Sequence, residues 1–163
     1  MEDVFTLASL IKQMDLKLHV RMIGKPYPKD SPYFKEFYLR SEDLPIKWDM
    51  DLADDAAADL LARSSIAYMP FPDGASGRRT SLLALLANGV ATITTRGAHT
   101  PSSLEQAVLF SPGPEQALRL VEKMRADNGL RKRLSDNARA YASQFSWDAI
   151  AQRHVELYEK LLG

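Results

Sequence analysis

The sequence predicts an α/β fold: a Rossmann-like parallel sheet flanked by helices, with further helices at the C-terminus. Two observations carry this prediction. Short apolar segments that predict strands alternate with segments that predict helices, and this alternation is typical of parallel sheets covered on both faces. Beyond Ser111-Pro112-Gly113-Pro114 the chain predicts only helices, which are expected to close the domain. We expect residues 1–163 to form a single domain, since the chain has the length of one.

The first quarter of the chain predicts a helix, a strand, a loop and a second helix. Apolar residues recur at helical spacing over residues 3–14, which predicts an amphipathic helix. Residues 16–23 alternate apolar with polar or basic side chains and predict a strand. The three prolines within residues 25–33 predict a loop. A short helix is expected over residues 34–39.

The middle of the chain predicts two more helices and three more strands. Residues 46–50 predict a short strand. Residues 51–63 are rich in alanine and leucine, with acids near the start, as a helix N-terminus favours. A buried strand is expected over residues 65–71, a helix over residues 80–87 and a strand over residues 90–95. The Asn-Gly pair between the last two is a natural helix stop.

The last third of the chain predicts one short strand and three helices. The strand is expected over residues 107–110. Helices are expected over residues 114–126, 129–142 and 147–162. Ser146 is a good N-cap for the last of them, and the apolar side chains of that helix fall on one face.

Composition and charge exclude several classes of protein. The chain carries 21 basic and 21 acidic residues, so no overall charge attracts nucleic acid or an anionic membrane. It has no cysteine, which excludes disulfides and thiolate metal sites and fits a reducing compartment. No apolar run approaches the roughly 20 residues that span a bilayer, and the N-terminus lacks the features of a signal peptide. The three scattered histidines form no metal-binding pattern. A cytoplasmic protein without a resident metal is expected.

Residues 72–79, between a predicted strand and a predicted helix, form the segment most suited to binding a ligand. The segment is rich in small residues, so backbone N–H groups at the helix entrance are accessible, and the helix dipole adds positive charge there. Two arginines add planar donors that match phosphate oxygens. We expect a phosphorylated ligand at the following candidate residues: Asp73, Gly74, Ser76, Gly77, Arg78, Arg79, Thr80 and Ser81. The alternative is an ordinary turn with solvated arginines.

In this order, the segments resemble the C-terminal, nucleotide-sugar-binding half of a GT-B glycosyltransferase of family 4, the glycosyl transferases of group 1. Six pieces carry the resemblance, and together they cover nearly the whole chain. They are residues 18–24, 46–63, 58–71, 88–95, 104–124 and 145–162. The last of these pieces, beginning Phe-Ser-Trp, is similar to the typical ending of the family.

The resemblance implies a function shared between two domains. Members of the family transfer a sugar from a nucleotide-activated donor to an acceptor, usually with retention and without a metal ion. Their C-terminal half holds the donor, and their N-terminal half holds the acceptor. The resemblance therefore implies a UDP- or GDP-sugar as donor substrate, no cofactor, and no catalytic residue supplied by this chain alone. It also implies a missing N-terminal acceptor domain or partner chain. The family's first strand is also missing, and its absence leaves an edge through which a homodimer can form.

The sequence departs from the family at the donor loop. The family carries two glutamates there, and the matching positions in this chain are Ser76 and Ala84. Ala84 cannot accept a hydrogen bond from a ribose hydroxyl, whereas Asp73 can replace the first carboxylate if the loop takes another route. An arginine and a lysine that neutralise the diphosphate in the family lie on the missing strand–helix unit, and we expect Arg78 and Arg79 to take over their role. Two alternatives stay open: a catalytically degenerate glycosyltransferase-like binding or partner module, and an unrelated Rossmann-like domain.

Overall fold

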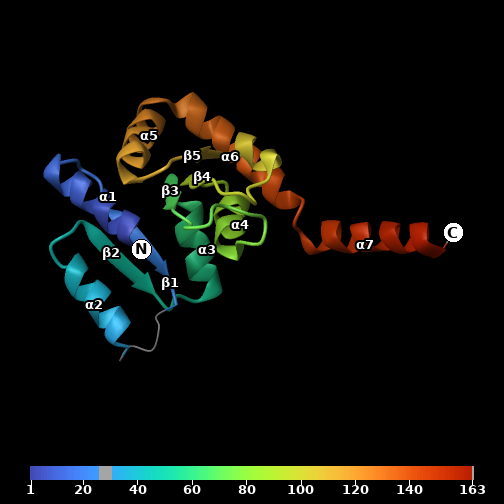
Figure 1. The fold of residues 1–163 in the computed structure, drawn as a ribbon, viewed down its shortest axis with the longest axis horizontal. Coiled ribbons are helices and arrows are strands. Elements are labelled where there is room, and N and C mark those ends of the chain that lie inside the picture. Colours follow the sequence, from blue (N-terminus) through green and yellow to red (C-terminus); the bar gives the residue numbers. More distant parts are fainter. Residues whose placement is uncertain (26–30, 163) are drawn as a thin grey trace.

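The computed structural model describes residues 1–25 and 31–162 and confirms the predicted fold class (Figure 1). Most of the loop expected over residues 25–33 lies outside the described residues. The helices are α1 (Glu2–Gln13), α2 (Pro32–Ser41), α3 (Asp54–Ala62), α4 (Thr80–Ala87), α5 (Pro114–Ala126), α6 (Asn128–Ser143) and α7 (Trp147–Leu162), with a 3-10 turn η1 (Ser102–Gln106). The strands are β1 (Val20–Gly24), β2 (Ile46–Met50), β3 (Ile66–Met69), β4 (Ala91–Thr94) and β5 (Val108–Phe110).

Two predicted boundaries are wrong by three residues or more, and both errors have a local cause. The first strand begins at Val20 and not at residue 16, because the N–H of Leu16 bonds back to the carbonyl of Ile11 at the end of α1 (3.0 Å). The helix expected from residue 51 begins at Asp54. Asp51 has a positive φ of 57°, which a helix does not accommodate, and its N–H bonds to the carbonyl of Gly24 (2.9 Å).

The strands are all parallel, as predicted, but they form two sheets among the described residues. β1 pairs with β2, with Val20 opposite Ile46. The second sheet has the order β3-β4-β5, with Ile66 opposite Ala91 and Thr92 opposite Val108. β4 is its central strand and is buried along its whole length, as expected for a parallel strand with neighbours on both edges and helices on both faces.

Two apolar clusters cover the β3-β4-β5 sheet. In the first, Leu7 and Ile11 of α1 pack with Ile93 of β4 and with residues of α5 and α6. In the second, Leu82 and Leu86 of α4 pack with residues of β5, η1 and the C-terminal part of α6. Because both clusters are apolar and close-packed, the sheet gives the loops at its ends a rigid base.

The last helix, α7, departs from the expectation that the C-terminal helices close the domain. α5 and α6 pack on the sheet, but α7 extends away from the rest of the chain and contributes no buried residue (Figure 1). Ser146 caps it as predicted, since its Oγ accepts a hydrogen bond from the N–H of Ala149 (3.2 Å). Among the described helices, none is both long and apolar enough to cross a membrane.

Candidate ligand-binding site

The predicted binding loop lies at the carboxyl ends of β3 and β4, where parallel sheets place their ligands. Two hydrogen bonds to Thr95, the residue that follows β4, fix its course. The N–H of Phe71 donates to Thr95 Oγ1 (2.9 Å), and the N–H of Ala75 donates to the carbonyl of Thr95 (2.9 Å). Ala75 itself is buried in the cluster beneath α4. The loop is therefore held to the end of β4 at both Phe71 and Ala75.

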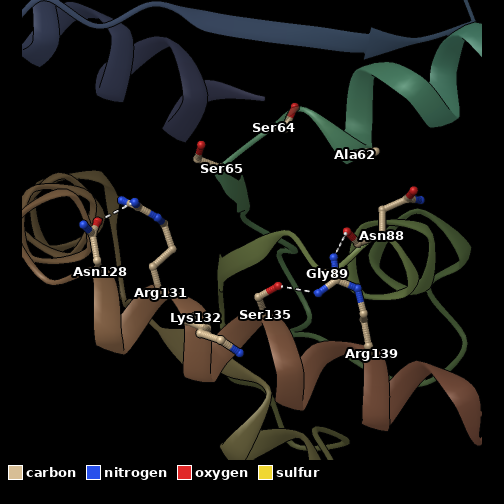
Figure 2. Close-up of a pocket in the computed structure, with 10 residues that line it drawn as sticks. All are labelled: Ala62, Ser64, Ser65, Asn88, Gly89, Asn128, Arg131, Lys132, Ser135 and Arg139. Atoms are coloured by element: carbon tan, nitrogen blue, oxygen red, sulfur yellow. Dashed lines mark hydrogen bonds between the residues drawn. The ribbon is translucent and has the colours of Figure 1, made fainter.

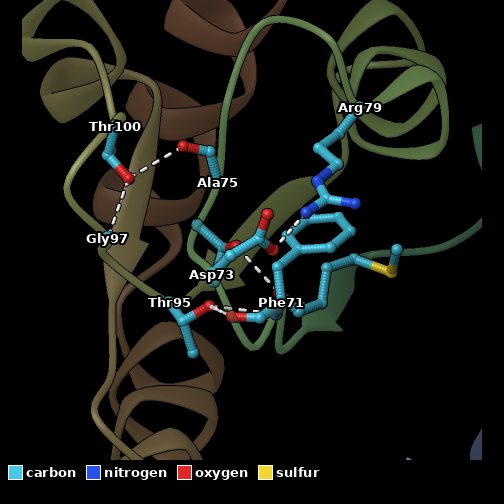
Figure 3. Close-up of polar contacts among 9 residues, drawn as sticks. Phe71, Asp73, Ala75, Arg79, Thr95, Gly97 and Thr100 are labelled. Atoms are coloured by element: carbon cyan, nitrogen blue, oxygen red, sulfur yellow. Dashed lines mark hydrogen bonds and ion pairs between the residues drawn. The ribbon is translucent and has the colours of Figure 1, made fainter.

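A neighbouring loop, residues 96–100, also contacts the binding loop (Figure 3). The hydroxyl of Thr100 donates to the carbonyl of Ala75 (2.8 Å) and accepts from the N–H of Gly97 (2.9 Å). Sequence reasoning missed Thr95, Gly97 and Thr100. Their position at or just beyond the carboxyl end of a predicted strand of a parallel sheet was the only available signal.

Two glycines allow these loops to touch. Gly74 has a φ of +88°, and a Cβ there would lie 2.2 Å from the backbone nitrogen of Gly97. A Cβ on Gly97 would lie 2.0 Å from the carbonyl oxygen of Asp73. Both distances are shorter than any real contact, and the obstructing atoms belong to the backbone. Neither position accommodates a side chain without moving the loop.

Arg79 is already engaged within the loop. Its Nη2 pairs with Oδ1 of Asp73, and its guanidinium lies over the ring of Phe71, 4.9 Å from the centroid (Figure 3). The pair is only partly shielded: the side chain of Arg79 is 35% exposed and that of Asp73 71%. The structure thus brings two predicted site residues together and gives the carboxylate a partner from the protein itself.

The entrance of α4 keeps unused donors. Arg79 is its N-cap residue and makes no side-chain capping bond. The backbone N–H groups of Thr80 and Ser81 have no partner among the described residues, as is usual for the first turn of a helix. Arg78 is exposed, and no ion pair or hydrogen bond engages its guanidinium in the described part of the chain. This end of α4 therefore combines unsatisfied N–H groups with an unpaired positive charge.

The remaining candidates lie around this entrance. Ser76 is half-buried, and a Cβ on Gly77 would lie 3.1 Å from the ring of Phe145, so the loop passes under that side chain. Ala84 is exposed on α4.

A hollow of about 280 Å³ lies at the opposite end of the sheet, between α6 and the C-terminal ends of α3 and α4 (Figure 2). Two of its arginines donate hydrogen bonds to uncharged oxygens. Arg139 donates to the carbonyl of Asn88 (3.2 Å) and to Ser135 Oγ (2.7 Å), and Arg131 donates to the carbonyl of Met124 (3.1 Å). These carbonyls lie at the ends of α4 and α5, where helices carry partial negative charge. The arginines offset that charge through these bonds.

Two pKa shifts identify groups with structural roles. Burial raises the pKa of Tyr68 on β3 to about 12, and its hydroxyl has no hydrogen-bond partner among the described residues. Two hydrogen bonds of 2.7 Å from Arg21 lower the pKa of Asp49, which joins β1 to β2. In the described part of the chain, no group of three or more histidine or acidic side chains is placed to hold a metal ion.

Comparison with known proteins places the fold among the glycosyltransferases. No known protein family is matched by the sequence, and no curated protein matches it. The C-terminal domain of a group 1 family glycosyl transferase from Francisella tularensis is similar in structure: TM-score 0.65, 16% identity, covering 87% of this chain and 76% of that chain.

Two longer glycosyltransferases are similar over almost the whole of this chain. Sucrose-phosphate synthase from Thermosynechococcus elongatus has a TM-score of 0.72 and 17% identity, covering 96% of this chain and 42% of its own. A glycosyltransferase from Rickettsia africae has a TM-score of 0.70 and 16% identity, covering 98% and 44%. The chain thus spans less than half the length of both. Its fold is that of one Rossmann-like half of a GT-B glycosyltransferase.

Proposed function

We propose that this chain is the donor-binding half of a nucleotide-sugar-dependent glycosyltransferase of the group 1 type, family 4, and that the entrance of α4 holds the diphosphate of the donor. The observation that carries the proposal is the uncapped helix N-terminus beside Arg78 and Arg79, on a loop fixed by backbone contacts at the carboxyl ends of β3 and β4. The residues proposed to form this site are Asp73, Gly74, Ser76, Gly77, Arg78, Arg79, Thr80 and Ser81.

The proposed chemistry is electrostatic. During sugar transfer with retention, negative charge grows on the diphosphate as it leaves. Arg78 and the N–H groups of Thr80 and Ser81 are placed to bind that charge, and preorganised donors of this kind stabilise a transition state by several kcal/mol. The donor is a UDP- or GDP-sugar, and neither a cofactor nor a metal ion takes part in this proposal. Because Ala84 offers no acceptor to the ribose, the diphosphate contacts carry most of the donor affinity.

A thermal-shift titration with UDP, GDP, ADP and their sugar conjugates tests the donor site. One nucleotide is expected to stabilise the chain by about 2.7 kcal/mol at a hundred times its dissociation constant. Arg78→Ala/Arg79→Ala is expected to abolish the shift. Arg119→Ala/Arg125→Ala removes the same charge from exposed positions on α5 and serves as the matched control, with the shift retained. A shift that survives in the loop variant would place the nucleotide elsewhere.

We also propose that the partner of this domain is an acceptor-binding half that covers α7. The helix exposes an apolar stripe: Trp147 is 86% exposed, Leu161 73% and Tyr158 57%. The alignments with the two longer glycosyltransferases extend over 96% and 98% of this chain, and more than half of each of those proteins has no counterpart in it. A second half of that size can bury the apolar stripe of α7.

Analytical ultracentrifugation distinguishes this partner from a homodimer. The isolated chain is expected to sediment as a monomer, and Trp147→Glu/Leu161→Glu is expected to leave both its sedimentation and its unfolding midpoint unchanged, because these side chains are exposed. A dimer that the variant dissociates would show that a second copy covers α7.

The second candidate function is a catalytically degenerate glycosyltransferase-like module that binds a protein partner. Two observations favour it: Ala84 at the position where the family binds the ribose, and Arg79 already paired with Asp73. Absence of a thermal shift with every nucleotide would favour this function over donor binding.

A further inference from the structure

We propose that Asp73 is a resident competitor for the ligand: its carboxylate occupies the position on Arg79 that a phosphate of the ligand must take. This inference rests on the proposed donor site and adds to it a residue that sets the affinity and selectivity of that site. It is carried by the pairing of Asp73 with Arg79 across the loop (Figure 3).

A carboxylate and a phosphate present equivalent oxygens to a guanidinium, and both accept its N–H groups in the same plane. Nη2 of Arg79 meets Oδ1 of Asp73, six positions earlier in the chain. Arg79 therefore has its charge satisfied while the site is empty. A ligand that binds through this Nη2 group must displace the carboxylate.

The surroundings indicate which of the two side chains moves. The guanidinium lies over the ring of Phe71 (4.9 Å to the centroid) and is 35% exposed, whereas the carboxylate of Asp73 is 71% exposed. The backbone of Asp73 is fixed by the close contact with Gly97. Displacement thus requires only rotation of the Asp73 side chain into water, with Arg79 left in place.

The competition selects ligands that make several contacts. An anion that offers only one interaction gains little over Asp73, which is already tethered beside Arg79. A diphosphate also reaches Arg78 and the free N–H groups of Thr80 and Ser81, so it gains more than it displaces. Exposed ion pairs are weak, and the pair therefore opposes such a ligand without excluding it.

Pyrophosphate titrations of the wild-type chain, Asp73→Asn, Arg79→Ala and the double variant test the inference by calorimetry. Asp73→Asn is expected to bind pyrophosphate about fivefold more tightly, because it removes both the competing pair and a repelling charge. In the Arg79→Ala background the same change is expected to have less than half of this effect, since competition acts through Arg79. Asp136→Asn removes an exposed lysine–aspartate pair on α6 and is the control, with no change in affinity.

The other outcomes overturn the inference in distinguishable ways. Weaker binding by Asp73→Asn would make Asp73 a positioning residue for Arg79. An equal gain in both backgrounds would reduce its effect to general repulsion. If nucleotides stabilise the wild-type chain but Asp73→Asn changes no affinity, the proposed function survives and the competition does not. If neither pyrophosphate nor any nucleotide binds the wild-type chain or Asp73→Asn, both proposals fail.

Discussion

The two ends of the β3-β4-β5 sheet each contain a glycine with positive φ that a neighbour approaches closely, but the neighbours differ. At the carboxyl end, a Cβ on Gly74 would lie 2.2 Å from the backbone of Gly97. At the amino end, a Cβ on Gly89 would lie 2.2 Å from the guanidinium of Arg139. A guanidinium at the end of a flexible side chain can move away, whereas a hydrogen-bonded backbone cannot. The carboxyl end is therefore the more rigid of the two, as a site that positions a ligand requires.

The arginines at the two ends also meet opposite ends of helices. Arg78 and Arg79 lie at the N-terminus of α4, where partial positive charge adds to their own and attracts an anion. Arg139 bonds to the carbonyl of Asn88 at the C-terminus of the same helix, where its charge is complemented. The same side chain therefore suits ligand binding at one end of α4 and helix capping at the other.

The largest loss of stability is expected from a substitution at the rigid, carboxyl end of the sheet. Gly97→Ala places a Cβ 2.0 Å from the carbonyl oxygen of Asp73, and the two loops must separate. We expect the free energy of unfolding to fall by about 3 kcal/mol, at the upper end of ordinary single substitutions. Urea denaturation measures the loss, and the nucleotide-induced thermal shift is expected to disappear with it.

Gly24→Ala is the matched control for Gly97→Ala. The nearest atom to its Cβ is Met50 Cε at 4.0 Å, an ordinary contact. Its expected effect is about 0.5 kcal/mol or less. Equal stability of the two variants would mean that the loops are not held by the contact between Gly74 and Gly97.

Local patterns in the sequence predicted most elements and the loop over residues 72–79, because helix periodicity and the Asn88-Gly89 stop depend only on neighbouring residues. They did not predict the hydrogen bonds that Thr95 and Thr100 make to the binding loop. The bonded residues lie about 20 or more positions apart in the sequence, and only the folded sheet brings them together. Sequence spacing also could not show that Asp73 pairs with Arg79. The apolar periodicity of α7 was read correctly, but periodicity identifies a face that needs cover and not what covers it.

Substitutions at the amino end of the sheet are expected to lower the free energy of unfolding by smaller amounts. Gly89→Ala forces a side chain into the left-handed conformation at φ +69°, which costs about 1–2 kcal/mol, and displaces the guanidinium of Arg139. Arg139→Ala alone removes one favourable contact with the end of α4 and is expected to cost about 0.5 kcal/mol. Urea denaturation of each variant measures both losses.

A double-mutant cycle separates the causes of these two losses. Combined, the two changes are expected to cost less than their sum, because in the Arg139→Ala background the methyl group added at position 89 has no guanidinium to displace. Urea denaturation of all four proteins measures the cycle. Neither variant is expected to alter the nucleotide-induced thermal shift. Loss of that shift in Arg139→Ala, with stability otherwise retained, would instead assign the ligand to the hollow at the amino end of the sheet.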